Sequence, residues 1–289
     1  MSQDMFRADW IAAAFDGQDL KAWPMQGSEP LQMLSCPIGP AGVVADLVSL
    51  TSSWLSPNPV PVVLSGDNMT TPVAVPCKPL ELVPQSDPQR HPRIVLHSLP
   101  GLAQAAPCAI MQTAAIRIAG FLSLNTDWDG VICLPGDQTH WALVSAGEVV
   151  SFQSFLTLST LTSLAELPVL APAFSDADWD RDALADAVSD AMSKPERLAA
   201  RLAEIQADMI LNNPAPASSL GRLLGLLIGA ELAAARPYWL GQNLAVIGDD
   251  LHSAPYAAAL GQQGLTATIA DAQRMALAGL VAAWRRVNS

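Results

Sequence analysis

Residues 223–264, LLGLLIGAELAAARPYWLGQNLAVIGDDLHSAPYAAALGQQG, form the stretch that decides the fold class. The pattern predicts a buried helix, a buried strand that ends at Gly248, and a second helix, over 220–236, 244–247 and 253–261. The first helix contains Glu231, and its apolar run is too short to span a bilayer. A buried strand between two helices indicates an α/β fold.

The rest of the chain alternates strands and helices in the same way. The predicted strands cover 7–24 with a turn at Asp16–Gly17, then 60–64, 93–99, 130–134, 141–144 and 148–155. The predicted helices cover 41–55, 108–124, 178–212 with a second helix opened by Pro195, and 271–286. This order fits two αβ halves around a cleft.

Composition excludes several classes of function. The chain has 289 residues, of which 51% are hydrophobic, and a net charge of −12. It is long enough for two domains, and its charge disfavours nucleic acid and anionic membrane as partners. Four cysteines lie far apart without a zinc pattern, so we expect reduced thiols and no metal. No signal peptide is evident, which predicts a cytoplasmic location.

Two segments resemble the 2-dehydro-3-deoxygalactonokinase family of sugar-acid kinases. In that family a helix reading S-G-L-L-I-G-A-E-L precedes a strand ending in I-G and a helix with Y-x-x-A-L, as in 223–264. Residues 127–155, DWDGVICLPGDQTHWALVSAGEVVSFQSF, resemble the family's DGVLCLPGTHSKW, and Pro100-Gly101-Leu102 matches its P-G-L step. The resemblance covers nearly the whole chain.

The resemblance implies a two-domain, actin-like (sugar kinase/Hsp70/actin, ribonuclease H-like) α/β fold with ATP and Mg²⁺ bound in the cleft between domains. It implies transfer of phosphate from ATP to the 6-hydroxyl of 2-dehydro-3-deoxy-D-galactonate, in galactonate catabolism. Residues 1–112 would form the sugar-acid-side domain and 113–289 the nucleotide-side domain. A homodimer is left open.

The same resemblance implies where ligands bind. The phosphate loop would be Pro135, Gly136, Asp137, Gln138, Thr139 and His140. The nucleotide would contact Gly225, Gly229, Glu231 and Gly248, although these glycines could instead only allow close packing between helix and sheet. The sugar acid would contact Asp19, Lys21, Asp67 and Asn68.

The catalytic positions depart from the family's pattern. The motif D-W-G-T-T-N-L-R-A-W aligns with residues 14–23, which places Ala14 at its first Asp and Asp16 at its Gly. Pairing Asp9 with the first Asp instead puts apolar side chains where Gly and Thr are needed. Both acids of the motif M-R-G-E-E-T-Q are replaced, by Ala114 and Ala115. Alanine can neither accept a proton nor bind magnesium, so no catalytic residue of these motifs is intact.

Three further motifs differ. The Arg of G-M-V-G-S-R-Q is missing from residues 65–71, the Lys of P-G-T-H-S-K-W is His140, and F-M-T-G-E-L-F at 155–161 lacks its Gly and Glu. Whether the protein is an enzyme therefore stays open between two main hypotheses. One is an active kinase with unusual residues; the other is a catalytically degenerate pseudokinase that binds nucleotide, sugar acid or a protein partner. A third hypothesis, a metal site built from loop acids and His140, competes with the interpretation that these are solvated loop residues.

Overall fold

The structure is a computed structural model that describes residues 8–17, 19–67, 69–175 and 178–288. The chain divides into two compact units. Unit 1 contains Met1–Asp129, Val144–Ser151 and Ala272–Ser289, and unit 2 contains Gly130–Leu143 and Phe152–Asp271. This division differs from the predicted single boundary after residue 112, because the helix that follows residue 112 packs against the C-terminal helix and both belong to unit 1.

Unit 1 is built around one mixed sheet. Its described strands are β1 (Trp10–Phe15), β2 (Asp19–Gln26), β3 (Glu29–Pro30), β4 (Leu34–Pro37), β5 (Val60–Ser65), β6 (Val73–Ala74), β7 (Gln85–Asp87), β8 (Ile94–Leu99), β9 (Leu102–Gln104) and β10 (Ala109–Met111). The main sheet has the order β3-β2-β1-β5-β8-β7 with β4 also paired to β2, and β10-β9-β6 form a separate small sheet. Strand β1 is antiparallel to β2 and parallel to β5, and β5 is parallel to β8.

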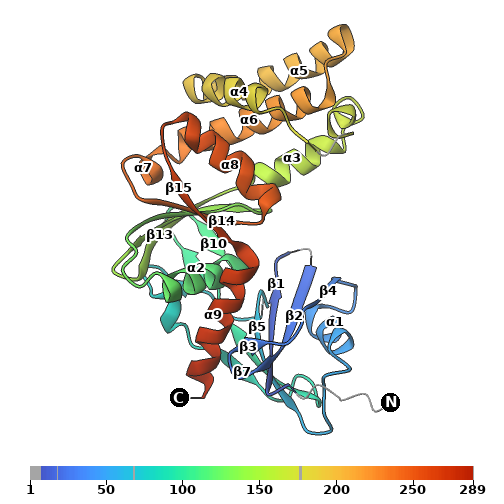
Figure 1. The fold of residues 1–289 in the computed structure, drawn as a ribbon, viewed down its shortest axis with the longest axis vertical. Helices are drawn as coiled ribbons and strands as arrows, with labels where there is room; N and C mark the ends of the chain where they lie inside the picture. The colour runs from blue at the N-terminus through green and yellow to red at the C-terminus, as the bar shows by residue number, and fades with distance from the viewer. Residues whose placement is uncertain (1–7, 18, 68, 176–177, 289) are drawn as a thin grey trace. The chain divides into compact units, whose positions relative to one another are not determined.

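Helices cover both faces of this sheet. The helical segments of unit 1 are α1 (Val43–Leu50), η1 (Pro79–Glu81), α2 (Thr113–Leu124) and α9 (Ala272–Val287). Ile11 and Ala13 of β1 share a core cluster with Leu47 of α1, whereas Trp10 stacks on Trp284 of α9 with ring centroids 4.8 Å apart. Figure 1 shows α1 and α9 on opposite faces of the sheet. The alternation of β1 therefore buries both of its faces, as a central strand requires.

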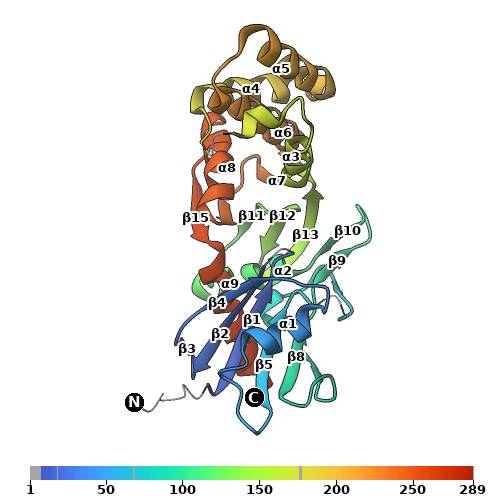
Figure 2. The same cartoon turned by 90° about the vertical axis from the view of Figure 1, so that its right-hand side faces the viewer.

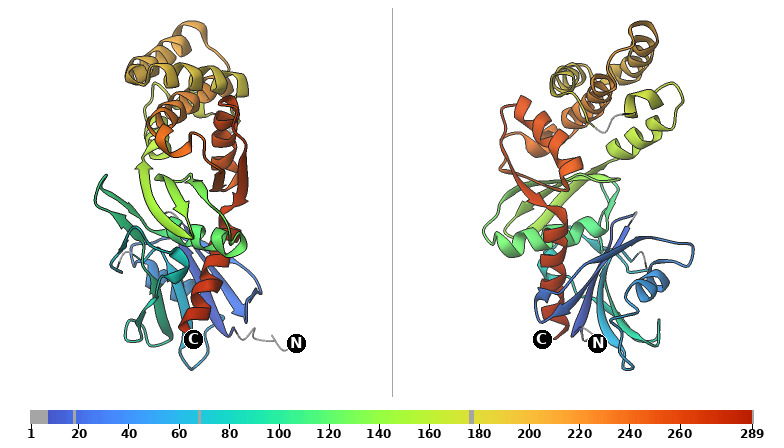
Figure 3. Two further views of the ribbon diagram at one scale, coloured as in Figure 1. Left: turned by 90° about the vertical axis from the view of Figure 1, so that its left-hand side faces the viewer. Right: turned by 45° about the vertical axis from the view of Figure 1, so that its right-hand side comes forward.

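Helix α2 lies against α9, and small residues make this close approach possible (Figure 3). A β-carbon on Gly120 would collide with the backbone of Met275 and lie 2.8 Å from Gly279 N. The predicted helix over 108–124 is wrong in its first turn, where Ala109–Met111 pair with β9 instead. The helix begins only at Thr113, so the ladder hydrogen bonds of β10 override the helical pattern of the sequence.

Unit 2 has a second mixed sheet with a similar order. Its strands are β11 (Gly130–Leu134), β12 (Thr139–Ser145), β13 (Glu148–Phe155), β14 (Leu244–Gly248) and β15 (Ala267–Asp271), of which the tip of the β12–β13 hairpin belongs to unit 1. The order is β13-β12-β11-β14-β15, and β11, β14 and β15 are mutually parallel. The two sheets are therefore alike: β5 and β8 follow β1 in parallel in unit 1, and β14 and β15 follow β11 in parallel in unit 2.

Helices of unit 2 pack around α6, its most apolar helix. The helical segments are α3 (Thr157–Ala165), η2 (Ala171–Phe174), α4 (Arg181–Ser193), η3 (Pro195–Arg197), α5 (Leu198–Asn212), α6 (Pro216–Ala234), α7 (Arg236–Trp239) and α8 (Asp250–Gln262). Figure 2 shows α4, α5 and α6 close together, and α6 packs against both of the others. Helix α6 has the length and composition of a membrane span, but 67% of its most apolar window is buried. It is therefore the core helix of a folded unit.

Candidate functional site

In unit 2, two neighbouring parallel strands end side by side. β11 ends at Leu134 and β14 at Gly248, and a β-carbon built on Gly248 would lie 3.7 Å from Pro135 Cδ. The loop after β11 and the start of α8 therefore meet at the carboxyl edge of the sheet. Open α/β sheets bind ligands at this edge.

One buried polar atom at this edge has no partner. Ser253 is only 3% exposed, and its hydroxyl makes no hydrogen bond within the described part of the chain. Its Oγ lies 2.5 Å from the position that a β-carbon on Gly248 would take. The first turn of α8 is capped by Asp249, which accepts from His252 N at 2.8 Å. An unpaired buried hydroxyl costs free energy, which a polar ligand group could recover.

The predicted phosphate loop divides into an exposed turn and a buried strand start. Asp137 and Gln138 are exposed, and the carbonyl oxygen of Asp137 accepts a hydrogen bond from Ser159 Oγ at 2.6 Å. Thr139 is fully buried and His140 is 5% exposed, with its Nδ1 2.8 Å from Ser154 Oγ. Both side chains are thus buried and hydrogen-bonded within the fold, and their contact with phosphate stays a prediction. Pro135–Gln138, which precede β12, are kept as the candidate loop.

Glu231 is the centre of a buried hydrogen-bond network, not an open ligand contact. Its carboxylate accepts from Trp141 Nε1 at 2.7 Å, from Tyr256 OH at 2.8 Å and from Thr157 Oγ1. Tyr256 OH lies 2.9 Å from Thr139 Oγ1, which extends the network to the start of β12. The network ties four elements together, namely β12, α3, α6 and α8. Sequence reasoning missed the three donors because they are distant along the chain.

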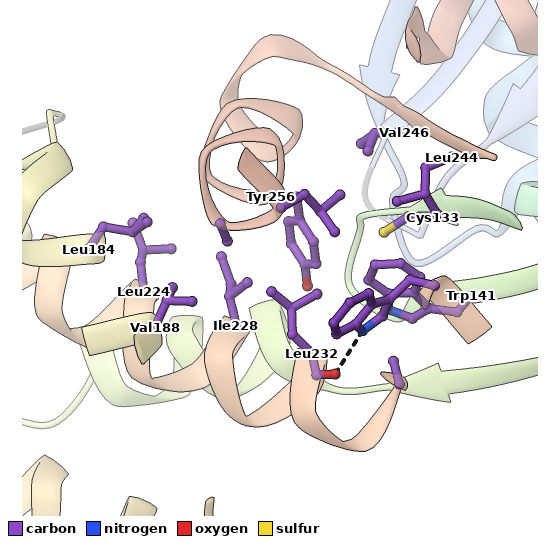
Figure 4. Packing of buried hydrophobic residues seen from close by; sticks show 14 of the residues in the cluster. Cys133, Trp141, Leu184, Val188, Leu224, Ile228, Leu232, Leu244, Val246 and Tyr256 are labelled. Carbon is purple, nitrogen blue, oxygen red and sulfur yellow. Dashed lines mark hydrogen bonds between the residues drawn. The ribbon is translucent and has the colours of Figure 1, made fainter. Parts of the chain in front are cut away.

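Burial decides the titration of this cluster. It raises the pKa of Glu231 to about 7, although the three hydrogen bonds oppose the shift. Burial, followed by the charge of Glu231, also raises the pKa of Tyr256 and of the Cys133 thiol well above their usual values. Figure 4 shows Tyr256 and Cys133 near Trp141 in the apolar core around α6. Cys133 is thus a buried, protonated thiol.

Gly225 and Gly229 serve helix packing. A β-carbon on Gly225 would collide with Leu184 O and lie 2.7 Å from Ala187 Cβ. One on Gly229 would lie 2.8 Å from Val188 O. Both glycines face α4, so they allow close packing, as the alternative expected, but of helix on helix and not of helix on sheet. Their contact with a nucleotide stays a prediction. Of the predicted nucleotide residues, only Gly248 lies at the carboxyl edge.

In unit 1, the three segments with altered motifs meet at one end of the main sheet. Gly66 follows β5 with φ of +94°, and a β-carbon there would collide with Phe15 O and lie 2.8 Å from Thr113 Oγ1. Thr113, the first residue of α2, also donates a hydrogen bond to Phe15 O. The end of β1, the end of β5 and the start of α2 are therefore neighbours. Only glycine fits this close approach.

The two possible alignments of the first motif use opposite ends of strand β1. Asp16–Gly17 form the turn between β1 and β2, as the alignment with residues 14–23 requires. Asp9 precedes β1, and its Oδ2 accepts from Gly27 N at 2.9 Å, at the other end of the strand. Ala14 is 6% exposed near the turn. The turn at Asp16–Gly17 is compatible with the alignment that places Ala14 at the motif's first Asp, which stays a prediction.

Asp16 is engaged by its own hairpin. Its Oδ1 accepts from Asp19 N at 2.9 Å, and its Oδ2 pairs with Lys21 Nζ at 3.3 Å. The predicted substrate-side residues Asp19 and Lys21 therefore lie beside Asp16. At the start of α2, Ala115 is 1% exposed and Ala114 is half-buried.

Asp67 forms a second ion pair at this end of unit 1. Its side chain is 4% exposed and binds Arg90, with Nη1–Oδ2 2.7 Å and Nη2–Oδ1 3.4 Å. Ser98 Oγ donates to Asp67 Oδ2 at 2.8 Å. Sequence reasoning missed Arg90, which lies 23 positions from Asp67 with no shared motif. The predicted residue Asn68 lies outside the described residues.

Metal ligands do not gather in the part of the chain that the structure describes. Within residues 8–17, 19–67, 69–175 and 178–288, no three His, Cys, Asp or Glu side chains could hold an ion together. The described residues give no support to the hypothesis of a metal site built from loop acids and His140.

Known proteins with similar sequences and folds identify the class. A family model described as 2-keto-3-deoxy-galactonokinase matches residues 26–283. The Rhizobium meliloti (strain 1021) protein named "Probable 2-dehydro-3-deoxygalactonokinase DgoK1" is 28% identical over 195 residues. That match covers 65% of this chain and 64% of the relative, so it spans less than two thirds of the relative's length.

Solved structures show the same fold. A Sinorhizobium meliloti protein assigned to the 2-dehydro-3-deoxygalactonokinases has a TM-score of 0.86 at 22% identity, covering 96% of this chain and 99% of its own. Component A of the Acidaminococcus fermentans (R)-2-hydroxyglutaryl-CoA dehydratase has a TM-score of 0.54 at 9% identity, with 97% and 99% covered. The fold is therefore the mixed α/β, actin-like fold of sugar kinases. Because the family model matches most of the sequence, the chain belongs to the 2-keto-3-deoxy-galactonokinase family.

Proposed function

We propose that this member of the family binds a nucleotide beside Gly248 and a sugar acid beside Asp67, and has lost most of its phosphoryl transfer. One observation carries the loss: of the acids at this end of the unit 1 sheet, Asp16 is ion-paired with Lys21 and Asp67 with Arg90. Phosphoryl transfer to a hydroxyl needs a carboxylate that orients the hydroxyl and accepts its proton.

The aligned motif positions offer no replacement. Ala14, Ala114 and Ala115 stand where the family's motifs carry acids. Removing one group that stabilises a transition state costs roughly 100- to 1000-fold in rate. Losses of groups that act as a unit do not add fully, but the remaining rate is small.

The residues fit a nucleotide better than they fit magnesium. The edge formed by Pro135–Gln138, Gly248 and the unpaired Ser253 hydroxyl offers backbone and hydroxyl groups to a polar ligand. Magnesium needs oxygen ligands in octahedral geometry, and the ammonium of Lys21 competes for Asp16. ATP, if bound, would supply the phosphoryl group, and the cytoplasm remains the proposed location.

Ser253 gives a test of the nucleotide half. Ser253→Ala removes a buried hydroxyl without a partner, so it should raise the free energy of unfolding by about 1 kcal/mol. The same change should weaken ATP binding several-fold in calorimetric titration, because the ligand loses its hydrogen bond. A variant that is neither stabilised nor weaker in binding would show that nucleotide does not use this edge.

An active kinase is the second candidate function. The turn of the first hairpin is kept, and Asp16 stands at it beside Lys21. In this alternative Asp16 would orient the sugar acid's hydroxyl once Lys21 turned to the substrate. Turnover that Asp16→Asn abolishes would favour it over the degenerate protein.

A further inference from the structure

Arg90 is a guanidinium held in place by a buried carboxylate. It comes from the segment between β7 and β8, and its Nη1 lies 2.7 Å from Asp67 Oδ2. Asp67 in turn directly follows Gly66 at the carboxyl end of β5. Planar, two-point pairing fixes the orientation of an arginine side chain better than a single contact does.

The carboxylate of Asp67 already accepts several hydrogen bonds, whereas Arg90 still has N–H groups without a partner among the described residues. Asp67 accepts from both terminal nitrogens of Arg90, from Ser98 Oγ and from Met69 N at 3.3 Å. Arg90 uses two of its five N–H groups in these bonds. Its side chain is 27% exposed, against 4% for Asp67. Three N–H donors of Arg90 therefore remain for an outside acceptor, while the negative charge of Asp67 is covered.

A small pocket lies beside this pair. Asp67, Thr70 and Gln112 contribute polar groups to it, and Gly66 and Gly101 also line it. Carboxylate, hydroxyl and amide groups line this pocket, and the Arg90 guanidinium binds the lining residue Asp67. Such polar groups suit a hydroxylated ligand better than an apolar one. The sequence 65–71 lacks the arginine of the aligned motif, so the structure supplies a guanidinium from a different segment.

We propose that Arg90, oriented by Asp67, binds the carboxylate of a small hydroxy acid at this end of unit 1. The inference rests on the proposed function and names the residue that selects an acid over a neutral sugar alcohol. A guanidinium and a carboxylate form two parallel charge-assisted hydrogen bonds. Lys21 also lies at this end of unit 1, but its ammonium lacks the planar fork that pairs with a carboxylate through two parallel hydrogen bonds.

The test is calorimetric titration of the full chain with D-galactonate and with galactitol, a six-carbon polyol without a carboxylate. The wild type should bind galactonate more tightly than galactitol. Arg90→Ala should weaken galactonate binding about 10- to 100-fold and leave galactitol unchanged. Arg90→Lys keeps the charge without the planar fork and should recover only part of the affinity.

Arg93→Ala is the matched control. Arg93 lies three positions away, and its Nη2 only reaches Leu55 O at 3.5 Å, so its loss should leave galactonate binding at the wild-type value. Thermal melting checks that each variant is folded. If Arg90→Ala is not folded, Arg90→Lys takes its place in the comparison of galactonate affinities. Equal galactonate affinity in the wild type and the Arg90 variants would overturn the inference, as would a wild type that does not prefer galactonate. Titration with ATP separates the two proposals: nucleotide binding without an Arg90 effect removes only the role of Arg90.

Discussion

Glu231 illustrates, at the scale of one residue, why the role of a polar side chain depends on its surroundings. The resemblance to the family implied a nucleotide contact for it, but three donors from three other elements surround it. Burial raises its pKa to about 7, so its charge is costly even with these donors. The network holds the start of β12 and the start of α3 in place, close to the candidate loop Pro135–Gln138.

The raised pKa predicts a pH-dependent stability. A carboxyl with a folded pKa near 7 and an unfolded pKa of 4.5 stabilises the fold fully below pH 4.5. That contribution is lost as the pH rises from 4.5 to 7, and it amounts to about 3 kcal/mol. Glu231→Gln cannot titrate, so its stability relative to wild type should rise by about this amount between pH 4.5 and pH 8. Urea unfolding of both proteins across this range measures it, and parallel pH profiles would contradict the assignment.

The residues that complete each candidate site lie far from their partners in sequence. Arg90 is 23 positions from Asp67, and Tyr256 is 117 positions from Thr139. No local spacing joins such residues, so the sequence could not predict either contact. What it could predict is the turn at Asp16–Gly17, because short-range turn chemistry places it. The alanines Ala14, Ala114 and Ala115 were likewise identified from the sequence alone.

At the scale of elements, patterns of apolar residues predicted most of the strands and helices. The β1–β2 and β12–β13 hairpins, α4, α5, α6, α8 and α9 lie where periodicity and turns place them. Among the elements that were missed, β15 and α3 show the reason. β15 is a short strand at the edge of the sheet. Its position is defined only by its pairing with β14. α3 begins with Thr157, and its packing on α6 decides its helical state more than its mixed composition does.

The contact between α4 and α6 gives an element-scale prediction. A side chain on Gly225 must overlap Leu184 O and Ala187 Cβ, so Gly225→Val should lower the free energy of unfolding by about 3 kcal/mol. Gly261→Ala is the control, since nothing lies within 4 Å of its added carbon in α8. That change should stabilise by about 0.5–1 kcal/mol. Chemical denaturation measures both, and tolerance of valine at Gly225 would show that α4 does not pack as described.

At the scale of the whole molecule, the chain has the fold of its family. The C-terminal helix α9 returns to unit 1, where Trp284 stacks on Trp10. The sequence predicted this helix but not its partner, because the two tryptophans lie near opposite ends of the chain. Three of the segments predicted to depart from the family's motifs meet at one end of the unit 1 sheet, where Gly66 meets Phe15 and Thr113. The carboxyl edge of unit 2 at Gly248 keeps its glycine and its turn.

Product formation tests the central claim most directly. The purified full chain is incubated with ATP, magnesium chloride and 2-dehydro-3-deoxy-D-galactonate, and ADP release is followed in a coupled assay with a control lacking the acid. Because Asp16 and Asp67 are ion-paired and the aligned acids are alanine, we expect ADP release no faster than in that control. Acid-dependent turnover that Asp16→Asn abolishes would contradict this account and establish an active kinase.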